Sequence, residues 1–232
     1  MGGLARVPFG RYLALYWSEM RLVRTGFDHA EIARKGYFNV REVLFNTVYA
    51  LGLEALAGLL EAAGEGTKAD RFRARGELVE TAILKECFDP ASGLYYDIDV
   101  RTGSQVLVPS VSCLMPIALG SIPGDRRDAL ISSLMDPKGF WPRYPVPSVP
   151  LSSRHFRPQS RLYLWRGPTW VNTNWFLCEG LRRHGVHDPA AEIARSGREL
   201  VELSGFREFY NPLTGEGGGQ EDFGWSTLAA VM

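Results

Sequence analysis

Apolar residues recur at helical spacing along nearly the whole chain, and this periodicity limits what the chain can fold into. Side chains three and four residues apart share one face of an α-helix, so the recurrence predicts helices. It predicts about eight of them, over residues 9–24, 41–63, 68–88, 109–120, 125–135, 168–184, 188–204 and from 222 onward. The fold class is therefore all-α, and an alternating stretch at 93–100 predicts a short β-strand or β-hairpin insertion.

Two kinds of predicted helix alternate along the chain. The first kind is apolar or small on most faces and begins near residues 43, 109, 168 and 223. The second kind is amphipathic, rich in Arg and Glu, and begins near residues 67, 125 and 188. A helix that is apolar all round is buried, and an amphipathic helix covers a core. The loose period of about 55 to 70 residues between buried helices predicts a ring of helical hairpins, with inner helices surrounded by outer ones.

The charge balance bears on which partners the chain has. Lys and Arg total 26 and Asp and Glu total 26, so no overall basic field favours nucleic acid or an anionic membrane. The most apolar stretch, 43–60, contains Asn46 and Glu54, which predicts a buried helix instead of a membrane span. Residues 1–10 lack the apolar core of a signal peptide. We therefore expect no nucleic acid, no membrane, a cytoplasmic protein, and a neutral or weakly charged substrate.

Cysteine, histidine and glycine patterns argue against several kinds of chemistry. Cys87, Cys113 and Cys178 are far apart with no CxxC spacing, and the four histidines form no ligand constellation. We therefore expect no metal and no cofactor. The glycine-rich loop at 215–220 lacks the Lys-Ser or Lys-Thr of a phosphate-binding loop, which disfavours nucleotide binding. Its backbone can instead approach a bound sugar or simply form a surface turn.

Three segments combine residue types that suit sugar binding. Residues 165–175 read WRGPTWVNTNW, residues 206–212 read FREFYNP, and residues 215–225 read GEGGGQEDFGW. Aromatic faces stack on sugar rings, amides and guanidinium groups bind hydroxyls, and a carboxylate can activate water. These segments favour a carbohydrate site, although a tryptophan cluster also suits a core.

These motifs, together with LYYD at 94–97, TG at 102–103 and YPVPSV at 144–149, resemble the C-terminal part of glycoside hydrolase family 63. That family contains processing α-glucosidases and mannosylglycerate hydrolase-like enzymes and is distantly similar to trehalases. The resemblance spans most of the chain. It implies an (α/α)6 toroid, incomplete at its N-terminal side, that forms a single catalytic-type domain over residues 1–232.

The resemblance also implies an inverting mechanism with two carboxyl groups. By its position in the motif, Glu208 matches the general base that activates water. The general acid of the family belongs to a segment resembling Gly-x-Asp-x-Ser-Pro, and this sequence contains none. Asp28, Asp97, Asp99 and Asp222 lack the surrounding pattern, so none of them takes that role.

The candidate sugar contacts come from the same motifs. Residues two apart on a helix point about 200° apart, so at most one of Asn172 and Asn174 faces the site. The substrate-binding candidates are Trp165, Arg166, Trp170, Asn174, Gln220, Glu221 and Trp225.

The function that follows is hydrolysis of a small α-linked sugar or oligosaccharide, with the general acid absent from the chain. The alternative is a non-catalytic carbohydrate-binding or assembly protein derived from such an enzyme. A sugar lyase or isomerase is disfavoured, because the balanced charge does not suggest a basic cleft. An apolar inner face left by absent hairpins predicts a homo-oligomer or an N-terminal half as partner.

Overall fold

The computed structural model describes residues 9–35, 39–159 and 164–232. Within these ranges helices dominate, which confirms the predicted all-α class. The helices are α1 (Phe9–Arg24), α2 (His29–Lys35), α3 (Val43–Ala62), α4 (Gly66–Glu86), η1 (Val111–Ala118), α5 (Gly124–Leu134), α6 (Val171–Arg183), α7 (His187–Ser204) and η2 (Gly224–Ala230). The strands are β1 (Val40–Arg41), β2 (Phe88–Asp89), β3 (Leu94–Tyr95), β4 (Ile98–Asp99), β5 (Arg207–Tyr210) and β6 (Gly217–Glu221).

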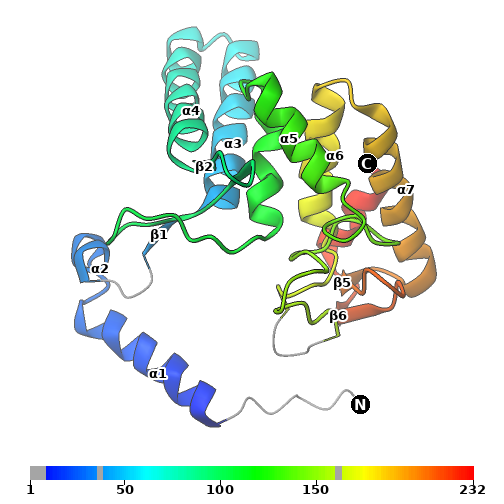
Figure 1. Cartoon of the computed structure of the whole chain (residues 1–232). Helices are drawn as coiled ribbons and strands as arrows, with labels where there is room; N and C mark the ends of the chain where they lie inside the picture. The colour runs from blue at the N-terminus through cyan, green and yellow to red at the C-terminus, as the bar shows by residue number, and fades with distance from the viewer. Residues whose placement is uncertain (1–8, 36–38, 160–163) are drawn as a thin grey trace.

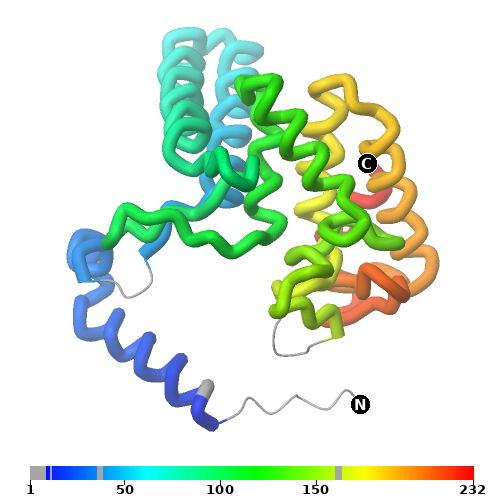
Figure 2. Tube along the Cα trace, viewed as in Figure 1, coloured from blue at the N-terminus to red at the C-terminus, as the bar shows by residue number. Residues whose placement is uncertain are grey.

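The helices form an arc of hairpins with an inner and an outer row. Inner helices pack on one another in the order α3, η1, α6 and η2, while α4, α5 and α7 pack against α3, η1 and α6 respectively. Figure 1 shows the hairpins one after another, with α1 and α2 projecting from the arc, and Figure 2 follows the same path as a continuous tube. The alternation of apolar and amphipathic helices predicted this division into two rows.

The core lies between the two rows. In η1, seven of the eight residues are buried, and only Ser112 is partly exposed. Leucines such as Leu130 of α5 and Leu181 of α6 are fully buried around it. Gly180 lets α6 approach η1 closely, because a Cβ there would lie 2.7 Å from the Ala118 Cα atom. The glycine therefore sets the distance between two inner helices.

Local structure departs from the prediction in two ways. The helices expected over 109–120 and from residue 222 are 3₁₀-helices, η1 and η2, instead of α-helices. Pro116 lies inside η1, and a proline without an N–H group cannot continue an α-helical hydrogen-bond ladder. The structure also contains the short helix α2, which periodicity did not predict because seven residues give too few turns.

The alternating stretch at 93–100 contains two strands that do not pair with each other. Strand β3 pairs with β2, with Tyr95 opposite Phe88, and strand β4 pairs with β1, with Asp99 opposite Val40. Through these two pairings the stretch contacts both β2, which follows α4, and β1, which precedes α3. A third antiparallel pair, β5 and β6, lies near the C-terminus.

Helix α3 is long and apolar enough to cross a membrane, judged by length and composition alone, and no other helix among the described residues is. It packs against α4 and η1. Its charged residues Glu54 and Glu61 form ion pairs with Arg183 of α6 and Arg73 of α4. These contacts are those of an inner helix in the arc.

Candidate active site

The β5–β6 hairpin holds Glu208 at an irregularity in its pairing. Arg207 lies opposite Glu221 and Phe209 lies opposite Gly218, so both Gly219 and Gln220 face Glu208. One extra residue in a strand is a β-bulge, which bends the strand and redirects a side chain. Here the bulge brings the backbone N–H of Gln220 to 3.1 Å from Oε2 of Glu208, to which it donates a hydrogen bond. The carboxylate is thus fixed by the backbone of the opposite strand.

The glycine-rich segment 215–220 is mostly strand β6, which corrects the prediction of a loop. A Cβ atom at Gly217, Gly218 or Gly219 would come closer than 3.0 Å to a side-chain atom of β5. The side chain over Gly219 is that of Glu208, and Gly219 itself has a φ of +71°, a conformation that favours glycine. The glycines are therefore needed because side chains of β5 lie directly over β6.

Contacts at the start of β5 restrain the backbone around Glu208. The Tyr210 hydroxyl donates to the carbonyl of Gly205 at 2.7 Å and accepts from the backbone N–H of Arg207 at 3.0 Å. The Arg207 guanidinium forms an ion pair with Glu221, and the Ser226 hydroxyl donates to the Arg207 carbonyl. The hairpin is therefore tied both to the end of α7 and to η2.

A cluster of aromatic rings adjoins the hairpin. Trp165 stacks on Trp170 with ring centroids 3.9 Å apart and an interplanar angle of 1°. Trp170 also contacts Phe209, with centroids 5.3 Å apart, and Trp225, with centroids 5.9 Å apart. Trp170 is only 2% exposed, whereas Trp165 is 45% and Trp225 is 44% exposed. Trp170 therefore supports the cluster from beneath, and Trp165 and Trp225 present the ring surface that solvent can reach.

Backbone pairing brings three of the motif segments side by side. The Thr169 N–H donates to the Tyr210 carbonyl at 2.8 Å, and the Tyr210 N–H donates back to the Thr169 carbonyl at 3.0 Å. On its other side Thr169 forms an antiparallel bridge with Pro147, and its hydroxyl donates to the Tyr144 carbonyl at 2.9 Å. The segments 144–149, 165–170 and 207–210 thus lie side by side as one backbone-paired layer, most of which is buried.

The other predicted sugar contacts lie in different environments. Asn174 is 1% exposed; its Oδ1 accepts from the Val146 N–H at 3.3 Å, and its Nδ2 donates to the Pro145 carbonyl at 2.8 Å. It therefore holds the 144–149 segment from inside the core. Arg166, Gln220 and Glu221 are exposed, and Glu221 is the ion-pair partner of Arg207. Asn172, the alternative to Asn174, is partly exposed at the start of α6.

Sequence reasoning gave no role to Glu42 or Asp97, two carboxylates that meet the start of α3. Oδ1 of Asp97 accepts from the backbone N–H of Val43 at 2.8 Å. Burial raises the pKa of the Asp97 carboxyl, and the nearby charge of Glu42 raises it further. Glu42 is the N-cap of α3; it accepts from the Phe45 N–H and from the Ser112 hydroxyl. Both carboxylates satisfy helix-terminal groups, as capping side chains do.

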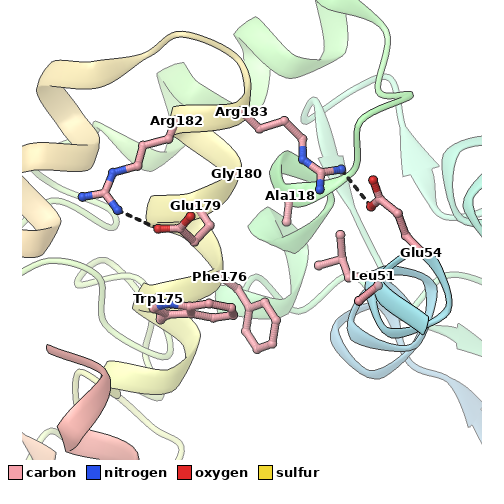
Figure 3. Close-up of a pocket in the computed structure, with 10 residues that line it drawn as sticks. Leu51, Glu54, Ala118, Trp175, Phe176, Glu179, Gly180, Arg182 and Arg183 are labelled. Atoms are coloured by element: carbon pink, nitrogen blue, oxygen red, sulfur yellow. Dashed lines mark hydrogen bonds and ion pairs between the residues drawn. The ribbon is translucent and has the colours of Figure 1, made fainter. Parts of the chain in front are cut away.

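One cavity lies away from Glu208. It has a volume of about 710 Å³ and opens between α3, η1 and α6, where Leu51, Trp175 and Phe176 line it (Figure 3). Two ion pairs border it, one between Glu54 and Arg183 and one between Glu179 and Arg182 (Figure 3). Among the described residues, no three His, Cys, Asp or Glu side chains are grouped to hold a metal ion.

A row of inner helices backed by outer ones is the architecture of the (α/α)6-toroid enzymes. The comparison with known families agrees. The chain belongs to the family described as the mannosylglycerate hydrolase MGH1-like glycoside hydrolase domain, whose sequence profile matches residues 9–226.

Individual relatives show how much of such a protein the chain represents. It is 34% identical to a mannosylglycerate hydrolase of Thermus thermophilus, over 97% of this chain and 52% of the relative. It is 29% identical to a glucosylglycerate hydrolase of Mycolicibacterium hassiacum, over 97% of this chain and 50% of the relative. A crystal structure of the family 63 mannosylglycerate hydrolase from Thermus thermophilus in complex with glucose superimposes with a TM-score of 0.79 at 33% identity, over 95% of this chain and 50% of that one. The chain therefore spans about half the length of the relatives it matches.

Proposed function

We propose that this chain forms the water-activating half of an inverting glycoside hydrolase, with Glu208 as the general base. The observation that carries the proposal is the β-bulge that fixes the Glu208 carboxylate, in the same hairpin whose Phe209 ring contacts Trp170 of the aromatic cluster. A general base must be held within hydrogen-bond reach of the water that it deprotonates. A carboxylate fixed by a backbone N–H, with its side chain half-buried and still reachable, meets this requirement.

The substrate we propose is a small glycoside of glycerate in which the sugar is mannose or glucose. Relatives of the chain carry the names mannosylglycerate hydrolase and glucosylglycerate hydrolase. Trp165 and Trp225 offer exposed ring faces for stacking on a sugar. Arg166, next to Trp165, is an exposed guanidinium that suits the carboxylate of a glycerate group.

In the proposed reaction Glu208 removes a proton from water while the water attacks the anomeric carbon. The departing oxygen takes a proton from a carboxylic acid on the opposite side of the sugar, roughly 6.5 to 9.5 Å from the base. The segment that would carry this acid has no counterpart in the 232 residues. We assign the acid to the part of the toroid that the relatives carry outside the matched segment.

The test uses a fusion enzyme in which this chain replaces the matching half of the Thermus thermophilus relative. We expect the fusion enzyme to hydrolyse mannosylglycerate or glucosylglycerate, and we expect the chain alone to show little activity. Proton NMR of the first-formed sugar should show an inverted anomeric centre. A retained configuration would contradict the mechanism. Tight binding of these glycosides by the fusion enzyme without any hydrolysis would favour a carbohydrate-binding protein instead.

A further inference from the structure

Helix α3 lies at the end of the inner row and has an inner neighbour on one side only. Helix η1 packs between α3 and α6, and α6 packs between η1 and η2, but α3 packs on η1 alone among the inner helices. Figure 1 shows α3 and α4 as the last hairpin at this end of the arc. In a closed ring every inner helix has two inner neighbours. One side of α3 therefore lies where the next inner helix of a ring would pack.

That side of α3 carries large apolar residues that are exposed to solvent. Phe45 is 71% exposed, Leu59 is 70% exposed and Leu56 is 38% exposed. Phe45, Gly52 and Leu59 are spaced seven residues apart, so with Leu56 they share one helical face, which we call the α3 stripe. The stripe contains no charged residue.

The charges of α3 lie on its other faces. Glu54 forms an ion pair with Arg183 at 3.0 Å, and Glu61 forms one with Arg73 at 2.7 Å. The stripe runs from Phe45 to Leu59, about 21 Å of the helix, and a charge-free surface of this length requires an apolar partner of similar length. Another helix meets this requirement.

Beside the stripe, α3 also lines the cavity that lies between α3, η1 and α6. Leu51 and Ala55, beside the stripe on α3, line the 710 Å³ cavity together with Trp175 and Phe176 of α6. Figure 3 shows the Trp175 and Phe176 rings on α6 across the cavity from Leu51, below the two ion pairs. The stripe and this cavity thus form one surface that spans two inner helices.

We propose that this surface binds a complementary set of helical hairpins, of the kind that the relatives carry outside the matched half. An inner helix of that set would lie along the α3 stripe, as η1 lies along the other side of α3. The relatives have about twice the length of this chain, and the arc holds four inner helices among the described residues, fewer than the six of an (α/α)6 toroid. A second copy would bring the number to eight, which a ring of six cannot hold. The proposal concerns assembly and does not depend on Glu208 being a base.

The test co-expresses this chain with a separate polypeptide, the part of the Thermus thermophilus relative that lies outside the matched segment. We expect the two to co-purify as a one-to-one complex by native mass spectrometry. Leu59→Lys places a charge in the α3 stripe and should weaken binding by about 10- to 100-fold, the equivalent of one buried leucine. Leu78→Lys is the matched control, because Leu78 is 72% exposed on the outer helix α4, and it should bind like the unmodified chain.

Three outcomes would overturn the proposal. The first is two soluble polypeptides that do not associate. The second is equal binding by the Leu59→Lys and Leu78→Lys variants. The third is a homodimer of this chain that Leu59→Lys disrupts and the second polypeptide does not displace, because a second copy would then occupy the stripe. If the second polypeptide is insoluble alone, the two are refolded together, and the first outcome is then a second polypeptide that stays insoluble while this chain remains in solution.

Discussion

Two helical glycines should respond in opposite directions to the same substitution. Replacing a glycine inside a helix by alanine stabilises the helix by about 0.5 to 1 kcal/mol. A Cβ at Gly58, on the exposed surface of α3, would meet no atom within 4 Å, so Gly58→Ala should give this gain. A Cβ at Gly180 would lie 2.7 Å from the Ala118 Cα atom and 2.8 Å from its nitrogen. Backbone atoms of a buried helix cannot move aside cheaply, and overpacking costs about 1 to 3 kcal/mol.

The net expectation for Gly180→Ala is a loss of about 1 to 2 kcal/mol, because the overpacking exceeds the gain in helix propensity. Urea denaturation followed by circular dichroism measures the free energy of unfolding of both variants. The melting temperature of Gly180→Ala should fall by roughly 2 to 8 °C, while that of Gly58→Ala should rise. If Gly180→Ala stabilises the protein as much as Gly58→Ala does, the close contact between α6 and η1 is refuted.

Two further predictions concern buried titratable groups. Because the pKa of Asp97 is raised above its ordinary value of 3.8, the folded state binds the extra proton, and stability should fall as the pH rises through the interval above that value. Asp97→Asn keeps an acceptor for the Val43 N–H but has no proton to lose, so it should remove this fall in stability. Urea denaturation at a series of pH values measures the stability, and an unchanged pH dependence would contradict the assignment. Burial raises the pKa of Cys87 to about 11 and that of Cys113 to about 12, so both thiols should react with a disulfide reagent far more slowly in the native state than in denaturant. Native-state labelling as fast as that of the denatured chain would show that these thiols are not buried.

The arrangement of the helices could be predicted from the sequence because burial leaves a periodic record. A helix such as η1 is apolar on most faces since it packs against both an outer neighbour and two inner ones, and α7 is amphipathic since it packs on one side only. The position of Glu208 in the motif at 206–212, which resembles that of glycoside hydrolase family 63, also predicted the candidate base. These features depend on local composition and motifs, so a single sequence is enough to predict them.

Features set by contacts between distant segments could not be predicted in this way. The glycine-rich segment reads as a loop, yet it is strand β6, because β5 lies over it and leaves no room for side chains. Trp165 and Trp170 read as equivalent platforms, but their stacking leaves one exposed and buries the other. Asn174 reads as a sugar ligand and instead bonds to the backbone at residues 145 and 146. In each case the structure depends on the segment that packs against the residue, which the local sequence does not reveal.

The role of Glu208 is tested most directly by the turnover of the fusion enzyme after Glu208→Gln. The amide keeps the size of the side chain and an oxygen that can accept from the Gln220 N–H, but it cannot take a proton from water. Glu216→Gln serves as the control, because Glu216 is exposed in the turn between β5 and β6. We expect kcat to fall by about 10²- to 10⁴-fold for Glu208→Gln, with KM nearly unchanged, and to stay near normal for Glu216→Gln. Near-normal turnover by the Glu208→Gln enzyme would contradict the assignment of Glu208 as the base.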